Sequence, residues 1–575
     1  MLYCSSRSLV LCGVALLCAG HTARADFALR ANDRVVFYGD SITEQRRYTT
    51  FAETFIVTRF PRLPLFFVHS GWGGDRVSGG GGGPIDLRLQ RDVLAYKPTV
   101  MTIMLGMNDG NYSPFNQNTL DTYSAGMNHI LDTVQKGDPG VRITLIQPSP
   151  YDDVTQPPKF EGGYNAVLGH FSDFLKTTAR QRNMGLADLN TPVVSMLQRA
   201  NALDKDGAQK IIPDRIHPGP GGGLIMAEAL LKAWGAPSIV TDVAIDAQAN
   251  RVIQMQNTQV TAFQSRQTPA GATLSWTQND GALPFPIPVD DPIVALAVKS
   301  SDFVDALDRE PLRLTGLSAP RYTLTIDGEE IGDFGRDELS QGINLALLPT
   351  PMLDQARDVH RLTLKHNDQH SERWRTFQVP FESHSVPVQN ALPALLAALD
   401  GEEAQTVAQQ RAAALPQPHH FQLSVSQPTG PNLALHKPYT STDPNVYDYG
   451  TGGLTDGSWS GEGPHTFASG ENDAFPKTTT IDLGAIQRVS KVRLGVPAFG
   501  STKTITVSLS ADGQNFTEVG SHVFSLATER RHTYSFAPVS ARYIRLMYPD
   551  HYEEEAGYHR NFVFTTEAEV YGPTG

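Results

Sequence analysis

The sequence predicts a multidomain protein with an α/β domain built on a parallel sheet, a mostly β middle region and a C-terminal β-sandwich. Three observations support this prediction. The chain has 575 residues, which at about 100–200 residues per domain suggests roughly three domains. Up to about residue 240, short apolar runs alternate with segments of helical period. Beyond that point, apolar and polar residues alternate, and turn signals separate the runs.

The composition excludes some classes of protein. Hydrophobic residues make up 40% of the chain and charged residues 19%, as in globular proteins that bury their own cores. The formal net charge is -13, so the chain lacks the excess of basic side chains that contacts with phosphates need. We therefore expect no nucleic-acid partner and no membrane span.

The first 25 residues have the pattern of a secretory signal peptide. Arg7 precedes an apolar run from Leu9 to Leu17, and Ala23-Arg24-Ala25 offers small residues for cleavage. The run is too short to cross a membrane as a helix. We expect cleavage after Ala25 and a periplasmic or secreted protein.

All three cysteines lie in this segment, as Cys4, Cys12 and Cys18. The mature chain would therefore carry no thiol. This excludes disulfides, thiolate metal sites and cysteine nucleophiles. We expect the stability of the protein to come from its cores alone.

Residues 26–240 form the predicted α/β domain. Apolar residues at helical spacing predict helices, for example from Leu120 to Val134 and from Tyr164 to Leu175. A last helix closes the unit before Gly235. Four apolar runs are typical of strands buried on both faces. They are Val35–Tyr38, Leu65–Val68, Val100–Leu105 and Val141–Ile146.

Residues 241–430 form the predicted middle region. Alternating residues around the turn Asp327-Gly328 predict a hairpin, and the region is predicted to be mostly β. The Ala- and Leu-rich stretch 391–415, interrupted at Asp400-Gly401, predicts two short helices. We hypothesise that this region packs on the first domain and forms one wall of its cleft. Turn residues at 427–431 predict a linker to the last domain at 431–573.

Two motifs of the first domain together indicate nucleophilic catalysis. Gly39-Asp40-Ser41 follows the first strand, which places Ser41 at the sheet edge where ligands of α/β proteins bind. Asp214-Arg215-Ile216-His217-Pro218 lies near the end of the domain. A serine nucleophile needs a base, and the base needs an acceptor that orients its ring; His217 and Asp214 suit these roles. Taken singly, each motif is also typical of an ordinary turn or surface loop.

Two further strand ends offer hydrogen-bond donors for a developing oxyanion. The glycines of Gly71–Asp75 would let a backbone N–H approach a substrate closely. In Gly106–Gly110, the Asn108 side chain carries an amide donor. Each segment alone is also typical of a turn after a strand. Four strand-end segments in this order favour an acyl-transfer site.

On these motifs, residues 26–240 closely resemble the SGNH, or GDSL-type, hydrolase family. The resemblance implies a three-layer α/β fold in which Ser41 is the nucleophile and His217 the base, oriented by Asp214. It also implies an oxyanion hole formed by the backbone N–H groups of Ser41 and Gly74 and by the Asn108 side chain. The reaction would pass through an acyl-enzyme and would need no cofactor.

Two features depart from the family pattern. His69 stands where the family often has asparagine. Gly79–Gly83 is a run of five glycines close to the predicted site. Three interpretations of the run remain open, namely an insertion, a lid or a hinge.

Residues 431–573 resemble the discoidin, or F5/8 type C, family, from Asn432-Leu433-Ala434 to the segment Glu567-Ala568-Glu569. The resemblance implies a galactose-binding-like β-sandwich, a fold that often binds sugars. A structural calcium, common in the family, would take oxygen ligands from Asp456 and Glu567. Aromatic and hydrogen-bonding side chains in predicted loops are candidates for sugar contacts, although each is also an ordinary loop residue. They are Trp459, His465, Tyr558, His559, Arg560 and Asn561.

Together, these features predict a secreted serine esterase that removes acetyl or other small acyl groups from a carbohydrate. Two alternatives remain. One is a lipase or thioesterase acting on lipidic acyl chains. The other is a glycan-binding adhesion protein whose hydrolase-like domain is inert, although the complete set of Ser41, Gly74, Asn108, Asp214 and His217 argues against it.

Overall fold

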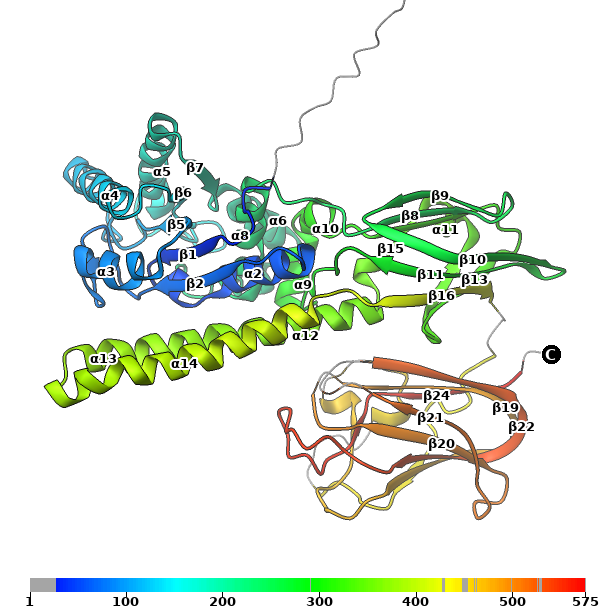
Figure 1. The fold of residues 1–575 in the computed structure, drawn as a ribbon. Helices are drawn as coiled ribbons and strands as arrows, with labels where there is room; N and C mark the ends of the chain where they lie inside the picture. Colours follow the sequence, from blue (N-terminus) through cyan, green and yellow to red (C-terminus); the bar gives the residue numbers. More distant parts are fainter. Residues whose placement is uncertain are drawn as a thin grey trace, which may run out of the picture.

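The computed structural model describes residues 27–289, 291–426, 430–446, 453–459, 461, 463–497, 499–524, 526 and 530–573 (Figure 1). The predicted signal peptide, 1–25, lies outside the described residues, and so do positions 427–429 of the predicted linker. Among the residues described, no helix has both the length and the apolar character needed to cross a membrane.

The first domain is built on five parallel strands in the order β2-β1-β5-β6-β7. Four of them coincide with the predicted apolar runs, which confirms the parallel α/β fold. The fifth, β7, is short and only partly buried, so its sequence shows no apolar run. The strands are β1 (Arg34–Gly39), β2 (Phe66–Gly71), β5 (Val100–Met104), β6 (Arg142–Gln147) and β7 (Gly185–Asp188).

Helices cover both faces of this sheet, which is the middle of three layers (Figure 1). On one side lie α2 (Arg47–Arg59), α6 (Thr191–Leu203) and α8 (Pro220–Ala233). On the other lie α3 (Ile85–Asp92), α4 (Gln117–Gly137) and α5 (Gly163–Arg182). Two short helices, α1 (Ser41–Glu44) and α7 (Lys205–Gln209), complete the unit.

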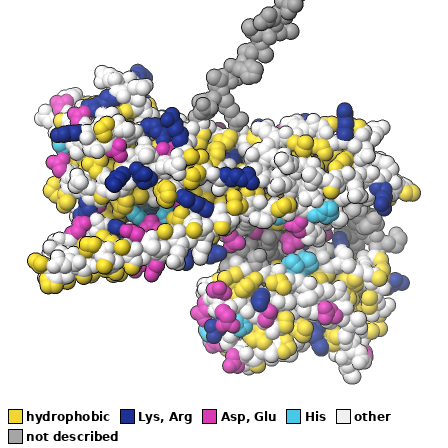
Figure 2. All heavy atoms as spheres, in the orientation of Figure 1, with side chains coloured by type: hydrophobic (Ala, Val, Ile, Leu, Met, Phe, Trp, Pro, Cys, Tyr) yellow, Lys and Arg dark blue, Asp and Glu magenta, His cyan; other side chains and the backbone are white. Residues whose placement is uncertain are grey.

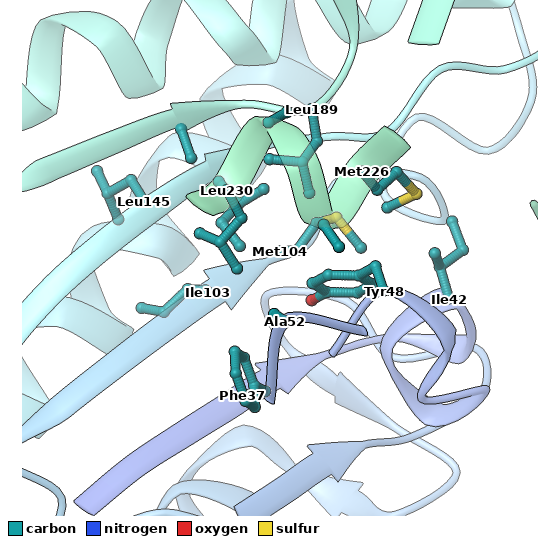
Figure 3. Close-up of a cluster of buried hydrophobic side chains, with 14 of the residues drawn as sticks. Phe37, Ile42, Tyr48, Ala52, Ile103, Met104, Leu145, Leu189, Met226 and Leu230 are labelled. Atoms are coloured by element: carbon teal, nitrogen blue, oxygen red, sulfur yellow. The ribbon is translucent and has the colours of Figure 1, made fainter. Parts of the chain in front are cut away.

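The core between the sheet and the first helical layer explains why these segments stay together. Figure 3 shows Phe37, Ile103 and Leu145 of the strands facing Tyr48 of α2 and Leu230 of α8. All five side chains are buried. Burying a side chain of this size contributes roughly 1.5–3 kcal/mol, so the apolar strand runs and helix stripes are stable only when packed together.

The first core extends beyond the predicted boundary at residue 240. After four strands of the middle region, the chain returns at Phe285 and forms α9 (Pro292–Lys299) and α10 (Phe303–Leu307), which contact α8. Phe285 and Phe303 are buried in the same cluster as the sheet residues. The structure therefore places this segment with the α/β domain, a return that no local sequence pattern reveals.

The middle region contains two sheets that share one apolar core. In that core Trp276 stacks on Phe421, with 5.0 Å between the ring centroids. The predicted hairpin at Asp327-Gly328 is confirmed, because Ile326 of β13 pairs with Glu329 of β14. One sheet contains β10 (Thr258–Thr268), β11 (Gly271–Asp280), β16 (Pro418–Val425), β13 (Arg321–Ile326) and β14 (Glu329–Gly335); the other contains β15 (Ile343–Asn344), β12 (Pro311–Thr315), β8 (Asp242–Asp246) and β9 (Arg251–Gln256).

A long helical arm leaves the middle region and runs along the first domain (Figure 1). It consists of α12 (Pro351–Ser371), a π-helical segment (Glu372–Gln378), α13 (Val379–Glu382) and α14 (Val386–Ala413); α11 (Arg336–Gln341) lies before it. The prediction of two short helices at 391–415 is wrong, because α14 continues through Gly401. Contacts along α12 stabilise α14, and they outweigh the cost of an internal glycine, about 1 kcal/mol.

The last domain is a β-sandwich, as predicted. Its main sheet has the order β17-β19-β22-β20-β21, and β24 also pairs with β19. Ile481, Val492, Ile544 and Leu546 are buried between its layers. The strands are β17 (Tyr439–Ser441), β19 (Lys477–Val496), β22 (Arg530–Tyr548), β20 (Thr504–Ser510), β21 (Thr517–Val523) and β24 (Ala568–Tyr571); β18 (Phe467–Ala468) pairs with β23 (Phe564–Thr565).

Candidate active site

Ser41 lies where β1 passes into α1, at the carboxyl edge of the sheet. The Asp40 carboxylate accepts a hydrogen bond of 3.0 Å from the Ile42 N–H and caps this short helix. A Cβ atom on Gly39 would lie 2.7 Å from the Met104 carbonyl oxygen. The strand therefore needs glycine at this position to turn Ser41 toward the sheet edge.

Ser41, His217 and Asp214 form one hydrogen-bonded chain. His217 Nε2 lies 2.8 Å from Ser41 Oγ, and His217 Nδ1 lies 2.6 Å from Asp214 Oδ2. Asp214 Oδ1 also accepts the backbone N–H groups of Ile216, at 3.0 Å, and His217, at 2.8 Å. These bonds fold the loop so that one carboxylate orients both the backbone and the ring of His217.

The hydrogen bonds also keep Asp214 ionised. Partial burial raises the pKa of this carboxyl, but the hydrogen bonds from the His217 ring, the His217 N–H and the Ile216 N–H outweigh it. The net result is a pKa below the usual value. An ionised Asp214 accepts the Nδ1 proton of His217, which leaves Nε2 free to take the proton of Ser41.

The glycine loop, which carries the predicted donor Gly74, lies beside Ser41. The backbone N–H of Trp72 donates a hydrogen bond of 3.0 Å to the Gly39 carbonyl oxygen. This bond anchors the glycine loop to the end of β1. In this loop, a Cβ atom on Gly73 would lie 4.0 Å from Ser41 Cβ, and Gly74 has a φ of +75° with open space on its Cβ side. The loop therefore presents backbone to the space beside the nucleophile.

Asn108 is oriented by two neighbours. Its Nδ2 donates to the Asp75 carbonyl oxygen at 3.0 Å, and its Oδ1 accepts from Tyr112 Oη at 2.8 Å. The Tyr112 bond fixes which end of the amide is the NH₂ group. An amide carries two N–H donors, and the Asp75 carbonyl oxygen accepts one of them.

Several carboxyl groups near the site are buried, and the sequence motifs did not predict this burial. Burial raises the pKa of Asp40 to about 7, helped by the nearby Asp109 and Asp75 charges. Burial raises the pKa of Asp109 to about 6. Asp75 is paired with the buried Arg88 at 2.7 Å. Both Asp40 and Asp109 lie in the sequence motifs, but their burial is a property of the fold.

The helical arm supplies the residues next to the glycine loop. The Arg375 guanidinium lies 3.5 Å above the Trp72 ring and donates to Glu44 Oε1 at 2.5 Å. The Trp374 ring meets Trp72 edge-on, with 5.4 Å between centroids. A cavity of about 270 Å³ lies here, lined by Glu44, Arg46, His69, Gly71, Ser371, Trp374 and Arg375. These arm residues were missed, because they lie more than 300 positions from Ser41 and belong to no motif.

The two departures from the family pattern have structural explanations. His69 is buried, with Nδ1 at 2.7 Å from Thr49 Oγ1 and Nε2 at 3.0 Å from Glu53 Oε2, and burial lowers its pKa to about 4. The glycine run forms a small hairpin, β3 (Gly79–Gly80) with β4 (Gly83–Pro84). A Cβ atom on Gly82 would lie 2.6 Å from the Trp72 ring. The run thus allows close packing on Trp72.

The sugar-binding candidates fall into two groups by their position in the last domain. Trp459 donates to Glu569 at 3.2 Å and is covered by the Arg531 guanidinium at 4.6 Å, while His465 bonds Asp456 at 2.7 Å. The second group follows β22. There Tyr558 packs on Phe499, His559 lies 3.6 Å from Glu555, Arg560 pairs with Glu553 at 3.2 Å, and Asn561 donates to the Glu471 carbonyl oxygen at 3.3 Å.

Two family models match separate parts of this chain. Residues 37–223 match the model of the GDSL-like lipase/acylhydrolase family, and residues 453–546 match that of the NedA-like, galactose-binding domain. The chain thus carries a GDSL-like acylhydrolase domain. With its serine, histidine and aspartate in one chain of hydrogen bonds, this domain is an ester-hydrolysing serine hydrolase.

Individual relatives are more distant. The chain is 24% identical over 227 residues to an acetylxylan esterase from Geobacillus stearothermophilus, covering 36% of this chain and 95% of that one. Among solved structures, a gut microbial diltiazem-metabolizing enzyme is 23% identical, with a TM-score of 0.60 over 70% of this chain and 100% of its own. A chitosan-binding module from Paenibacillus sp. IK-5 is 25% identical over 25% of this chain and 100% of its own, with a TM-score of 0.21. The diltiazem-metabolizing enzyme matches more of this chain than the GDSL-like domain alone. The fold that the two proteins share therefore continues into the middle region.

Proposed function

We propose that this protein is a carbohydrate esterase that removes acetyl or another small acyl group from a polysaccharide. The observation that carries the proposal is the hydrogen-bonded chain of Ser41, His217 and Asp214 in a molecule that also has a galactose-binding-type domain. The acetylxylan esterase relative supports the same substrate class.

The geometry suggests a two-step reaction. Ser41 Oγ attacks the ester carbonyl carbon while His217 Nε2 takes its proton, and Asp214 stabilises the imidazolium that forms. The oxyanion accepts hydrogen bonds from the N–H groups of Ser41 and Gly74 and from Asn108 Nδ2. The bond between the carbonyl carbon and the sugar oxygen then breaks, and the imidazolium protonates that oxygen, so the sugar leaves with a free hydroxyl. Water, activated by His217, releases the acid from the acyl-enzyme.

The wall beside the glycine loop supports a polar, sugar-like substrate. The cavity here is lined by one aromatic residue, Trp374, and by the charged hydrogen-bonding groups of Arg375, Glu44 and Arg46. This combination of one aromatic ring and several polar groups is typical of sites that bind sugars. A long acyl chain would instead need an extended apolar groove.

Acetate release from a panel of acetylated polysaccharides tests the proposal. We expect the wild type to release acetate and Ser41→Ala to be slower by about 10³–10⁶-fold, because the nucleophile is lost. Ser113→Ala, which removes an exposed hydroxyl of the same domain, should behave as the wild type. Full activity of Ser41→Ala would contradict the mechanism. Hydrolysis of long-chain nitrophenyl esters in preference to acetates would favour a lipase instead.

We also propose that the last domain binds a structural calcium ion at Asp456 and Glu567. The donor chemistry fits, because Glu567 Oε1 is buried without a hydrogen-bond partner and burial, with Asp456 and Glu569 nearby, raises the pKa of Glu567 to about 9. Calorimetric titration with calcium should show binding that Asp456→Asn removes; equal binding by the variant would contradict this site.

Export through cleavage after Ala25 stays a prediction, and N-terminal sequencing of the mature protein checks it.

A further inference from the structure

The hairpin tip of the middle region docks on the last domain. Glu330 of β14 accepts a hydrogen bond of 3.4 Å from Thr533 of β22. It also lies 3.8 Å from Lys491 Nζ and 3.6 Å from Arg493 Nη2, both of β19. Figure 2 shows acidic and histidine side chains where these two domains meet. The two domains thus share a charged interface.

Beside Glu330, three potential metal ligands converge from the two domains. They are Glu329 of β14, His522 of β21 and His532 of β22, and one ligand atom from each lies within 4.8 Å of the others. His522 Nε2 lies 3.5 Å from Glu329 Oε1. The two imidazole rings stack with 3.8 Å between centroids and 11° between planes.

Two details of this cluster point to a ligand rather than a simple ion pair. His532 Nδ1 is buried without a hydrogen-bond partner, and leaving a buried nitrogen unsatisfied is unfavourable. Both rings are also flanked by aromatic edges, His522 by Phe524 at 4.7 Å and His532 by Tyr534 at 4.6 Å. A cation bound here would give His532 Nδ1 a partner, once the two parallel rings turn so that their in-plane lone pairs converge.

We propose that Glu329, His522 and His532 bind a divalent transition-metal ion, with zinc the best match, that joins the last domain to the middle region. Two imidazole nitrogens and one carboxylate oxygen form a ligand set typical of zinc. Zinc bonds of about 2.0–2.2 Å place tetrahedral ligand atoms about 3.4 Å apart, so binding requires the three ligand atoms to move closer together and the two rings to turn out of their parallel stack. The side chains of Glu329 and His522 are 17% and 22% exposed, which leaves room for water as a fourth ligand.

Zinc binding by the full chain, prepared without a polyhistidine tag, tests the proposal. After EDTA treatment and desalting, calorimetric titration with zinc chloride is run with calcium present, so that oxygen-only sites are filled. We expect one zinc ion per chain. Glu329→Gln, His522→Ala and His532→Ala should each weaken binding at least about tenfold. The control His559→Ala removes an exposed histidine of the same domain and should bind as the wild type.

Small-angle scattering measures the bridging role. Zinc should make the wild type more compact than EDTA does, and it should have no such effect on Glu329→Gln. This variant changes a residue outside the last domain, so it does not disturb the fold that carries the two histidines. Absence of zinc binding, binding unchanged in all three variants, or bound zinc without compaction would overturn the proposal. Ester hydrolysis should be unchanged in every variant, so the two proposals fail independently.

Discussion

At the scale of single residues, the reactivity of Ser41 depends on how its neighbours hold protons. Asp214 accepts the Nδ1 proton of His217 and two backbone N–H groups, and these bonds hold its pKa below the usual value despite partial burial. The carboxyl therefore stays ionised over a wider pH range than an ordinary aspartate does. His217 receives both its tautomer and its position from this one side chain.

Replacing Asp214 with asparagine tests this role. Asp214→Asn keeps the size of the side chain but removes the charge that stabilises the imidazolium, so kcat should fall by about 10³–10⁴-fold with little change in KM. Steady-state hydrolysis of a nitrophenyl acetate measures both. Asp121→Asn, on an exposed part of α4, serves as the control. A kcat within a few-fold of the wild type would show that Asp214 does not orient the base.

At the scale of elements, the helical arm is joined to the first domain by a buried chain of charges. Glu53 of α2 lies 3.0 Å from His366 Nδ1, and His366 Nε2 lies 3.1 Å from Glu403 of α14. His69, His370 and Gln410 also contact these carboxylates. Burial alone would lower the pKa of His366, but the two carboxylates raise it to about 10. The arm is thus held by a protonated histidine between two acids.

This buried network of charged side chains makes the stability of the arm depend on pH. An unfolded histidine loses its proton near pH 6.5, whereas folded His366 keeps it up to about pH 10. The free energy of unfolding should therefore fall as pH rises through this window, by up to about 1.4 kcal/mol per pH unit. Below about pH 6.5 the contribution is complete.

Thermal unfolding measures this effect. Between pH 6.5 and about 9.5, the wild-type Tm should fall by several degrees more than that of His366→Gln, since about 2–4 °C correspond to 1 kcal/mol in a domain of this size. His129→Gln, which removes an exposed histidine paired with Asp86, should behave as the wild type. Parallel Tm curves for the wild type and His366→Gln would show that His366 is not charged in the folded protein.

At the scale of the whole molecule, the described residues form three apolar cores that share few residues. The catalytic core, the middle core and the core of the last domain are distinct clusters. The arm connects the first two, since Arg46 pairs with Asp368 at 2.8 Å and Trp374 Nε1 donates to Asp92 at 2.7 Å. The last domain contacts the middle region through Glu330.

This arrangement predicts that the last domain affects where the enzyme acts rather than its chemistry. A chain ending at residue 426 should hydrolyse a soluble acetate ester within about twofold of the full chain, because both remaining cores are complete. It should lose most of its retention on insoluble acetylated glycans in a pulldown. Equal retention by the two chains would show that the last domain does not bind the substrate.

The sequence by itself determined those features that depend on local patterns. Apolar runs of strand length predicted four of the five parallel strands, and the turn at Asp327-Gly328 predicted its hairpin. The site motifs were readable because each follows a strand directly, so topology brings Ser41, Gly74 and Asn108 to one edge.

Only the tertiary structure decided what depends on contacts between distant segments. The return of Phe285 to the first core and the position of Trp374 and Arg375 beside Trp72 result from packing across hundreds of residues. The continuous α14 results from its packing along α12. The same is true of Glu329 meeting His522 and His532. Such contacts are set by the burial free energy of whole surfaces, which exceeds the local preference of any single glycine or histidine.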